Sequence, residues 1–138
     1  MTVVVDASVA LKWYVVEQDT PMAWTVRDGA DAVIAPDLMI AEVCHAAWKA
    51  WRRGELGPEH RQRIAAHITR AYDRLTPLSP LAERALAIAG ALDHPVHDCF
   101  YLALAEVEAG QLVIVDRRLL AKVAGTPFAD RTRLLGEI

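Results

Sequence analysis

The sequence predicts an α/β fold, a three-layer α/β/α sandwich built on a short central parallel sheet. Short runs of apolar, mostly β-branched residues are separated by longer segments with helical periodicity. Two of these runs stop abruptly at an acid, residues 3–5 before Asp6 and residues 112–115 before Asp116. Strands that alternate with helices typically form parallel sheets covered on both faces.

Four strands are expected, at residues 2–5, 32–35, 76–78 and 112–115. Seven helices are expected between and after them, at residues 7–16, 21–28, 38–53, 58–72, 80–92, 97–109 and 117–123. Asp6 or Ser8 is available to cap the first helix and Asp37 the third, while Gly54 closes the third. The residues after 123 are predicted as loop, with an edge strand as the alternative.

Length and composition limit the protein class. A chain of 138 residues suits one domain, and we expect a single domain over 1–138. Hydrophobic residues make up 54% of the chain, which is enough for a sizeable core. No apolar run approaches the roughly 18 residues that cross a membrane, and the start does not resemble a signal peptide, so a cytoplasmic protein is expected. Cys44 and Cys99 do not form a disulfide framework and are expected as small buried side chains.

Two candidate functional acids stand at predicted strand ends. Asp6 and Asp116 each follow an apolar strand, at the edge of a parallel sheet where ligands bind. Aspartate between a strand and a helix is also a common helix cap, and that alternative remains open for both. Ser8 can cap the helix or orient Asp6.

Two further acids lie inside predicted helices. Glu42 has no capping role, because Asp37 already occupies the cap position of its helix. Asp98 shares a helix face with apolar residues at its i+3, i+4 and i+7 positions. A carboxylate on an apolar face is costly unless it is paired, protonated or bound to a cation. A salt bridge is the alternative for either residue.

Taken together, the four acids predict a metal site. Oxygen ligands gathered at one edge of a sheet suit Mg²⁺ or Mn²⁺. Two such ions can hold the attacking and leaving oxygens of a phosphodiester. The net charge of −3 argues against non-specific nucleic-acid binding, unless basic residues cluster locally or metal ions supply the positive charge.

The chain resembles the VapC-type PIN domains. The resemblance covers nearly the whole chain, and its segments follow the order of that family. They are VVVDASVALKW at residues 3–13, APDLMIAEV at residues 35–43, HDCFYLALA at residues 97–105 and VIVDRRLL at residues 113–120.

The resemblance implies a PIN-like fold and a Mg²⁺- or Mn²⁺-dependent ribonuclease that is the toxin of a toxin–antitoxin pair. It also implies an RNA substrate, a homodimer and a VapB-like antitoxin that blocks the site. Asp6 and Asp98 match the direct metal ligands of the family, and Glu42 and Asp116 complete the site. Cleavage on the family pattern leaves a 3′-hydroxyl and a 5′-phosphate.

One position departs from the family, which often has Thr or Ser two residues before the last acid. Here that position is Ile114, which makes Asp116 the least certain ligand. A catalytically silent PIN-like module that binds RNA or protein is therefore the alternative function. A phosphoryl-transfer signalling domain ranks below both, because its sites need paired early acids and this chain has Asp6 followed by Ala-Ser.

Basic and aromatic side chains gather in the middle of the chain. A solvated helix face is the default interpretation of the basic residues, and a surface that contacts RNA or antitoxin is the alternative. Burial in the core is expected for the tryptophans, with a groove or dimer surface as the alternative for Trp48 and Trp51. The basic residues are Lys49, Arg52, Arg53, Arg61, Arg63 and Arg70, followed near the C-terminus by Arg117 and Arg118.

Overall fold

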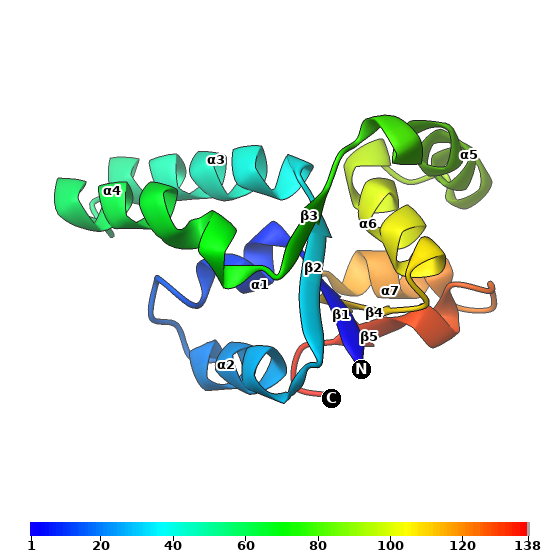
Figure 1. Cartoon of the computed structure of the whole chain (residues 1–138), viewed down its shortest axis with the longest axis horizontal. Helices are drawn as coiled ribbons and strands as arrows, with labels where there is room; N and C mark the ends of the chain where they lie inside the picture. The colour runs from blue at the N-terminus through cyan, green and yellow to red at the C-terminus, as the bar shows by residue number, and fades with distance from the viewer. Residues whose placement is uncertain (138) are drawn as a thin grey trace.

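A computed structural model describes residues 1–137 and has a five-stranded sheet at its centre, in which every neighbouring pair of strands is parallel. The strands lie in the order β3-β2-β1-β4-β5 (Figure 1). They are β1 (Thr2–Val5), β2 (Ala32–Pro36), β3 (Arg74–Thr76), β4 (Gln111–Ile114) and β5 (Thr132–Leu134). The edge strand that the sequence left open is β5.

Helices cover both faces of the sheet, which confirms the predicted three-layer class. In Figure 1, α1 and α2 lie on one side of the strands, and α5 and α6 lie on the other. Among residues 1–137, no helix has both the length and the apolar character needed to cross a bilayer. The helices are α1 (Ala7–Leu11), α2 (Thr20–Gly29), α3 (Leu38–Arg52), α4 (Pro58–His67), α5 (Ala82–Leu92), α6 (Val96–Val107) and α7 (Arg117–Val123), with 3₁₀ turns η1 (Ile68–Ala71), η2 (Ser79–Leu81) and η3 (Ala129–Arg131).

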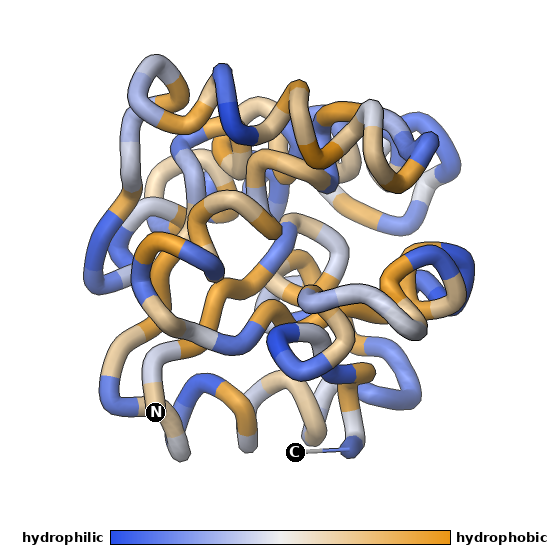
Figure 2. Tube along the Cα trace, turned by 90° about the vertical axis from the view of Figure 1, so that its right-hand side faces the viewer, coloured by the Kyte–Doolittle hydropathy of each residue, from blue (hydrophilic) through white to orange (hydrophobic). Residues whose placement is uncertain are grey.

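The core is densest where α6 lies on the sheet. Five consecutive α6 residues, from Tyr101 to Ala105, are at most 1% exposed, so this helix is buried on nearly all sides. It packs against β1, β2 and β4 on the sheet and against α5 on its outer side. The outer helices instead alternate hydrophobic and hydrophilic residues, which gives each one an apolar face (Figure 2).

The order of the strands creates a switch point in the sheet. From β1 the chain adds β2 and then β3 on one side, and it returns to the other side of β1 to add β4 and β5. The register pairs Val5 with Val113, so the carboxyl ends of β1 and β4 are adjacent. In open parallel sheets, ligands bind outside the strands at such a switch point.

Several expected bounds are wrong. The strand expected at residues 76–78 is β3 at Arg74–Thr76, and the helix expected over 58–72 ends at His67 and continues as the 3₁₀ turn η1. The first helix was expected over residues 7–16, but it ends at Leu11. The indole N–H of Trp13 donates to the backbone oxygen of Ala23 at 2.9 Å, which ties this segment to α2. The two β-branched valines at residues 15 and 16 also have a low helix propensity. Asp37 occupies the cap position of α3 but its side chain makes no capping hydrogen bond.

Four expected burials are also wrong. Trp24, Trp48 and Trp51 are 37%, 44% and 39% exposed, and Cys44 is exposed as well. Trp24 lies on α2, and the other three lie on α3, on sides of these helices that face solvent. For Trp48 and Trp51 the structure favours the alternative of an exposed surface.

A pair of leucine substitutions tests this account of the core. Leu102→Ala on α6 removes a fully buried side chain and should lower the free energy of unfolding by about 2–5 kcal/mol. Leu86→Ala on α5 removes a side chain that is 68% exposed and should change it by less than about 0.5 kcal/mol. Urea unfolding followed by circular dichroism measures both, and equal losses would contradict the burial described.

Candidate active site

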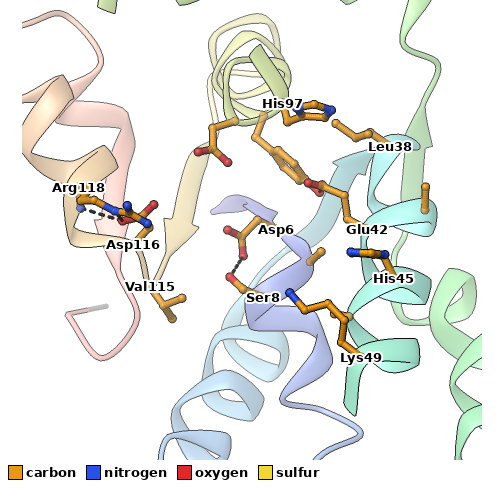
Figure 3. Close-up of a pocket in the computed structure, with 15 residues that line it drawn as sticks. Asp6, Ser8, Leu38, Glu42, His45, Lys49, His97, Val115, Asp116 and Arg118 are labelled. Atoms are coloured by element: carbon orange, nitrogen blue, oxygen red, sulfur yellow. Dashed lines mark hydrogen bonds and ion pairs between the residues drawn. The ribbon is translucent and has the colours of Figure 1, made fainter. Parts of the chain in front are cut away.

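All four predicted acids line one open cleft of about 870 Å³ at the carboxyl edge of the sheet. Asp6 follows β1, Glu42 lies on α3, Asp98 begins α6, and Asp116 precedes α7. Figure 3 shows Asp6, Glu42 and Asp116 pointing toward a common space from three different elements. The cleft lies at the switch point between β1 and β4, because Asp6 and Asp116 follow those two strands.

Asp6 is both a helix cap and a cleft residue. Its Oδ1 accepts hydrogen bonds from the backbone N–H of Val9 at 3.0 Å and from the Ser8 hydroxyl at 2.8 Å. Ser8 therefore orients Asp6, and the Asp6 side chain caps α1. Both hydrogen bonds use one oxygen, which leaves Oδ2 available to the cleft.

Asp116 is held in a similar way at the start of α7. Its Oδ1 accepts from the backbone N–H of Arg118 at 2.8 Å, and the Arg118 Nε lies 3.6 Å from the same oxygen. The side chain of Ile114 is buried and takes no part in these contacts. Arg118 thus holds this acid without the hydroxyl that the family often supplies at position 114.

Glu42 receives its support from across the fold. The Tyr101 hydroxyl on α6 donates to Glu42 Oε1 at 2.6 Å. Burial, and then the nearby Glu42 charge, raise the pKa of Tyr101, so this hydroxyl remains a donor at neutral pH. The contact joins α3 to α6 over the cleft.

Asp98 has a partner that sequence reasoning missed. The His94 Nε2 lies 2.6 Å from Asp98 Oδ2, and the His94 side chain is only 8% exposed. The two residues are four apart, but His94 precedes α6 rather than lying in it. The spacing of four residues between His94 and Asp98 is a signal for such a pair. It does not predict the bend before α6 that brings the imidazole to the carboxylate.

The carboxylates raise the energy of one another's charged forms. The pKa of Asp6 is raised to about 6. Burial is the largest cause and the charges of Asp98 and Glu42 add to it, while the hydrogen bonds from its two donors lower the pKa. Burial also raises the pKa of Glu42, and Asp98 adds to the effect while the Tyr101 hydrogen bond lowers it. Within residues 1–137, no lysine or arginine forms an ion pair with Asp6 or Glu42.

The donor chemistry of the cleft fits a hard divalent cation. Its acids offer only oxygen atoms, and a bound cation would offset the burial and the like charges that raise the pKa of Asp6. In the described part of the chain, however, no three His, Cys, Asp or Glu side chains are arranged to hold a metal ion as they stand. Each acid instead faces a donor of the protein, so metal binding requires some side-chain rotation.

Other residues of the sequence analysis separate into two groups. His45, Lys49, His97 and Arg118 line the cleft, whereas Arg117 does not. Figure 3 shows His45 and Lys49 below Glu42 on α3, with the Lys49 side chain extending toward Ser8. Lys49 and Arg118 are therefore the cations best placed to meet a phosphate in the cleft.

Comparison with known proteins supports the family expected from the sequence. The family model of the PIN domain matches residues 3–126. The chain belongs to the PIN-domain family. Its resemblance to the VapC-type PIN domains is confirmed by a relative named Ribonuclease VapC3, from Pyrobaculum aerophilum. The two are 33% identical over 124 residues, which are 88% of this chain and 95% of that protein.

Two solved structures share the fold of this PIN domain. A toxin–antitoxin complex from Klebsiella pneumoniae matches with a TM-score of 0.71 and 17% identity, over 99% of this chain and 99% of the matched chain. The crystal structure of PAE2754 from Pyrobaculum aerophilum matches with a TM-score of 0.68 and 25% identity. That match covers 91% of this chain and 82% of the other.

Because its charged form is disfavoured, Asp6 should limit the stability of the metal-free PIN domain. With EDTA present at pH 7, Asp6→Asn should raise Tm by roughly 5 °C, since Asn keeps an acceptor for Ser8 and Val9 but carries no charge. The raised pKa in the folded state means that the penalty grows as pH rises from about 4 to about 6.

Thermal melts of both proteins between pH 4 and pH 7 measure this difference. The gap in Tm should be smallest near pH 4, where Asp6 is protonated in the folded state and only partly ionised in the unfolded chain, and largest at pH 7. A variant that is less stable than the parent at pH 7 would show that Asp6 is not under electrostatic strain.

Proposed function

We propose that this PIN domain, taken as one domain over 1–138, is a metal-dependent endoribonuclease that acts as the toxin of a toxin–antitoxin pair. One observation carries the proposal. Four acids from four separate elements, Asp6, Glu42, Asp98 and Asp116, line the same cleft at the switch point of a parallel sheet. The relative named Ribonuclease VapC3 supports RNA as the substrate.

The metal ligands follow from these acids. Asp6 and Asp98 are the proposed direct ligands, and Glu42 and Asp116 complete the site, either through water or by holding a second ion. When bound, Mg²⁺ or Mn²⁺ supplies the positive charge that attracts a phosphodiester and activates the attacking water.

The residues of the chain position the reactants. Ser8, His94 and Tyr101 hold Asp6, Asp98 and Glu42 at the cleft, and these acids would bind the metal after rotation of their side chains. Lys49 and Arg118 line the cleft and offer cations to the phosphate oxygens.

The proposed reaction is a hydrolysis at phosphorus. A water oxygen bonds to phosphorus while the bond between phosphorus and the 3′ oxygen breaks. The departing oxygen takes up a proton, which leaves a 3′-hydroxyl on one fragment and a 5′-phosphate on the other.

The partners are proposed on the same basis. A VapB-like antitoxin would inhibit by covering the cleft. The VapC name of the 33% identical relative supports an antitoxin as partner. The solved toxin–antitoxin complex adds the likeness of fold. A homodimer is proposed from the family resemblance.

One observation favours a second function, that of a catalytically silent module that binds RNA or protein. Ile114 replaces the hydroxyl that often stands two residues before the last acid, and its side chain is buried. The Arg118 contacts of Asp116 supply an alternative support, which is why we rank hydrolysis first.

Cleavage of single-stranded RNA by the purified protein tests the proposal. The parent should cut in Mn²⁺ or Mg²⁺ and stop when EDTA is added. Asp98→Asn should lower the cleavage rate by more than about 100-fold. Loss of a residue that only supports a metal ligand typically lowers activity by roughly 10- to 100-fold, and a direct ligand should matter more. Asp28→Asn, an exposed acid on α2, is the matched control and should cut like the parent.

Two results would contradict the nuclease proposal. One is equal cleavage by parent and Asp98→Asn with chelator present, which would point to a contaminating nuclease. The other is RNA binding by the parent without any turnover in either metal, which would favour the silent module.

A further inference from the structure

The outward side of α3 carries an aromatic and cationic surface that begins inside the cleft. His45, Trp48, Lys49 and Arg52 are three or four residues apart, so they share one side of the helix. We call these four residues the α3 surface. His45 and Lys49 also line the acid cleft (Figure 3).

Trp48 is the centre of this surface. The imidazole of His45 stacks on its indole, with ring centroids 5.7 Å apart and an interplanar angle of 25°. The guanidinium carbon of Arg52 lies 5.1 Å from the centroid of the same ring. Despite both neighbours, Trp48 is still 44% exposed.

A second hollow extends the cleft along α3. It has a volume of about 270 Å³ and is lined by Trp48, Lys49, Arg52 and Arg53. Lys49 lines both hollows, so the surface is continuous from the acids to the exposed indole.

The charge of this surface suits a polyanion. Arg53 is paired with Glu55 at 3.0 Å, but across residues 1–137 neither Lys49 nor Arg52 forms an ion pair with an acid. Two-fold pairing of this surface with a second copy would bring these cations against their own counterparts. A strand with a phosphate at each step and flat bases between matches both the cations and the indole.

We propose that the α3 surface is a base-stacking subsite for the single-stranded RNA whose phosphodiester enters the acid cleft. Trp48 receives a nucleobase on its exposed indole, and Lys49 neutralises the phosphate between that base and the scissile bond. The inference rests on the proposed nuclease function and names the form of its substrate, a single strand with unpaired bases. Stacking on an indole is tolerant of base identity, so the subsite fixes the path of the strand rather than its sequence.

Abasic RNA tests the subsite directly. The probe is a single-stranded RNA of about ten nucleotides with an end label, together with a set in which one abasic nucleotide is moved along the strand. Fluorescence anisotropy in Ca²⁺ measures Kd for the parent, Trp48→Ala, Trp48→Phe and Trp51→Ala. Trp51 is the matched control, because it is 39% exposed on the same helix and lines neither hollow.

Trp48→Ala should weaken binding of the intact RNA by about tenfold, whereas Trp48→Phe should retain most of the affinity and Trp51→Ala should stay within about twofold of the parent. One abasic position should weaken the parent by the same factor and have no further effect on Trp48→Ala, which identifies the base that stacks. An unchanged Kd for Trp48→Ala, or an equal loss at every abasic position, would overturn the subsite.

Two parallel measurements separate the remaining explanations. If Trp48→Ala converts a dimer to a monomer in light scattering without changing Kd, the surface is a contact between copies and the subsite is wrong. Cleavage of the intact RNA in Mn²⁺ is measured separately. If the RNA is cleaved but the abasic position and Trp48→Ala weaken binding independently, only the subsite is rejected. If their effects on Kd are coupled but the RNA is not cleaved, only the nuclease function is rejected.

Discussion

The burial of several carboxylates side by side at one edge of the sheet is the constraint on which the site depends. Parallel strands bring Asp6 and Asp116 to the same edge, and α3 and α6 add Glu42 and Asp98. Burial and like charge raise the pKa of Asp6 to about 6, so its ionised form in the cleft is electrostatically unfavourable. This arrangement does not stabilise the fold, whereas a divalent cation in the cleft would be attracted by the clustered carboxylates.

The protein limits this electrostatic cost with donors placed around the acids. Backbone N–H groups at the starts of α1 and α7 donate to Asp6 and Asp116, and the side chains of Ser8, His94 and Tyr101 contact Asp6, Asp98 and Glu42. Because these donors come from elements that also form the core, the positions of the acids are coupled to the packing of the whole domain. Tyr101 shows this best, since its ring is buried on α6 and its hydroxyl reaches Glu42 on α3.

Local pattern was enough to predict β1, β2 and β4, most helix boundaries and the four acids, whereas the third strand was placed two residues too late and β5 was left open. Asp6 and Asp116 could be found because each directly follows a buried strand, and Glu42 and Asp98 because each interrupts a helical pattern. The partners of the acids could not be found, since Tyr101 and Glu42 are 59 residues apart and meet only in the folded chain. The burial of Trp24 and Trp48 was mispredicted because hydrophobicity does not say which helix side another layer covers.

Binding of Mn²⁺ to the purified protein, followed by electron paramagnetic resonance, shows whether the acids of the cleft hold a divalent cation. The account predicts one or two ions per chain, a number set by the acids of the cleft, and loss of this binding when Asp6 and Asp98 are both changed to Asn. It also predicts that Mg²⁺ competes for the same sites. Equal Mn²⁺ binding by the parent and the double variant, or none by either, would contradict it.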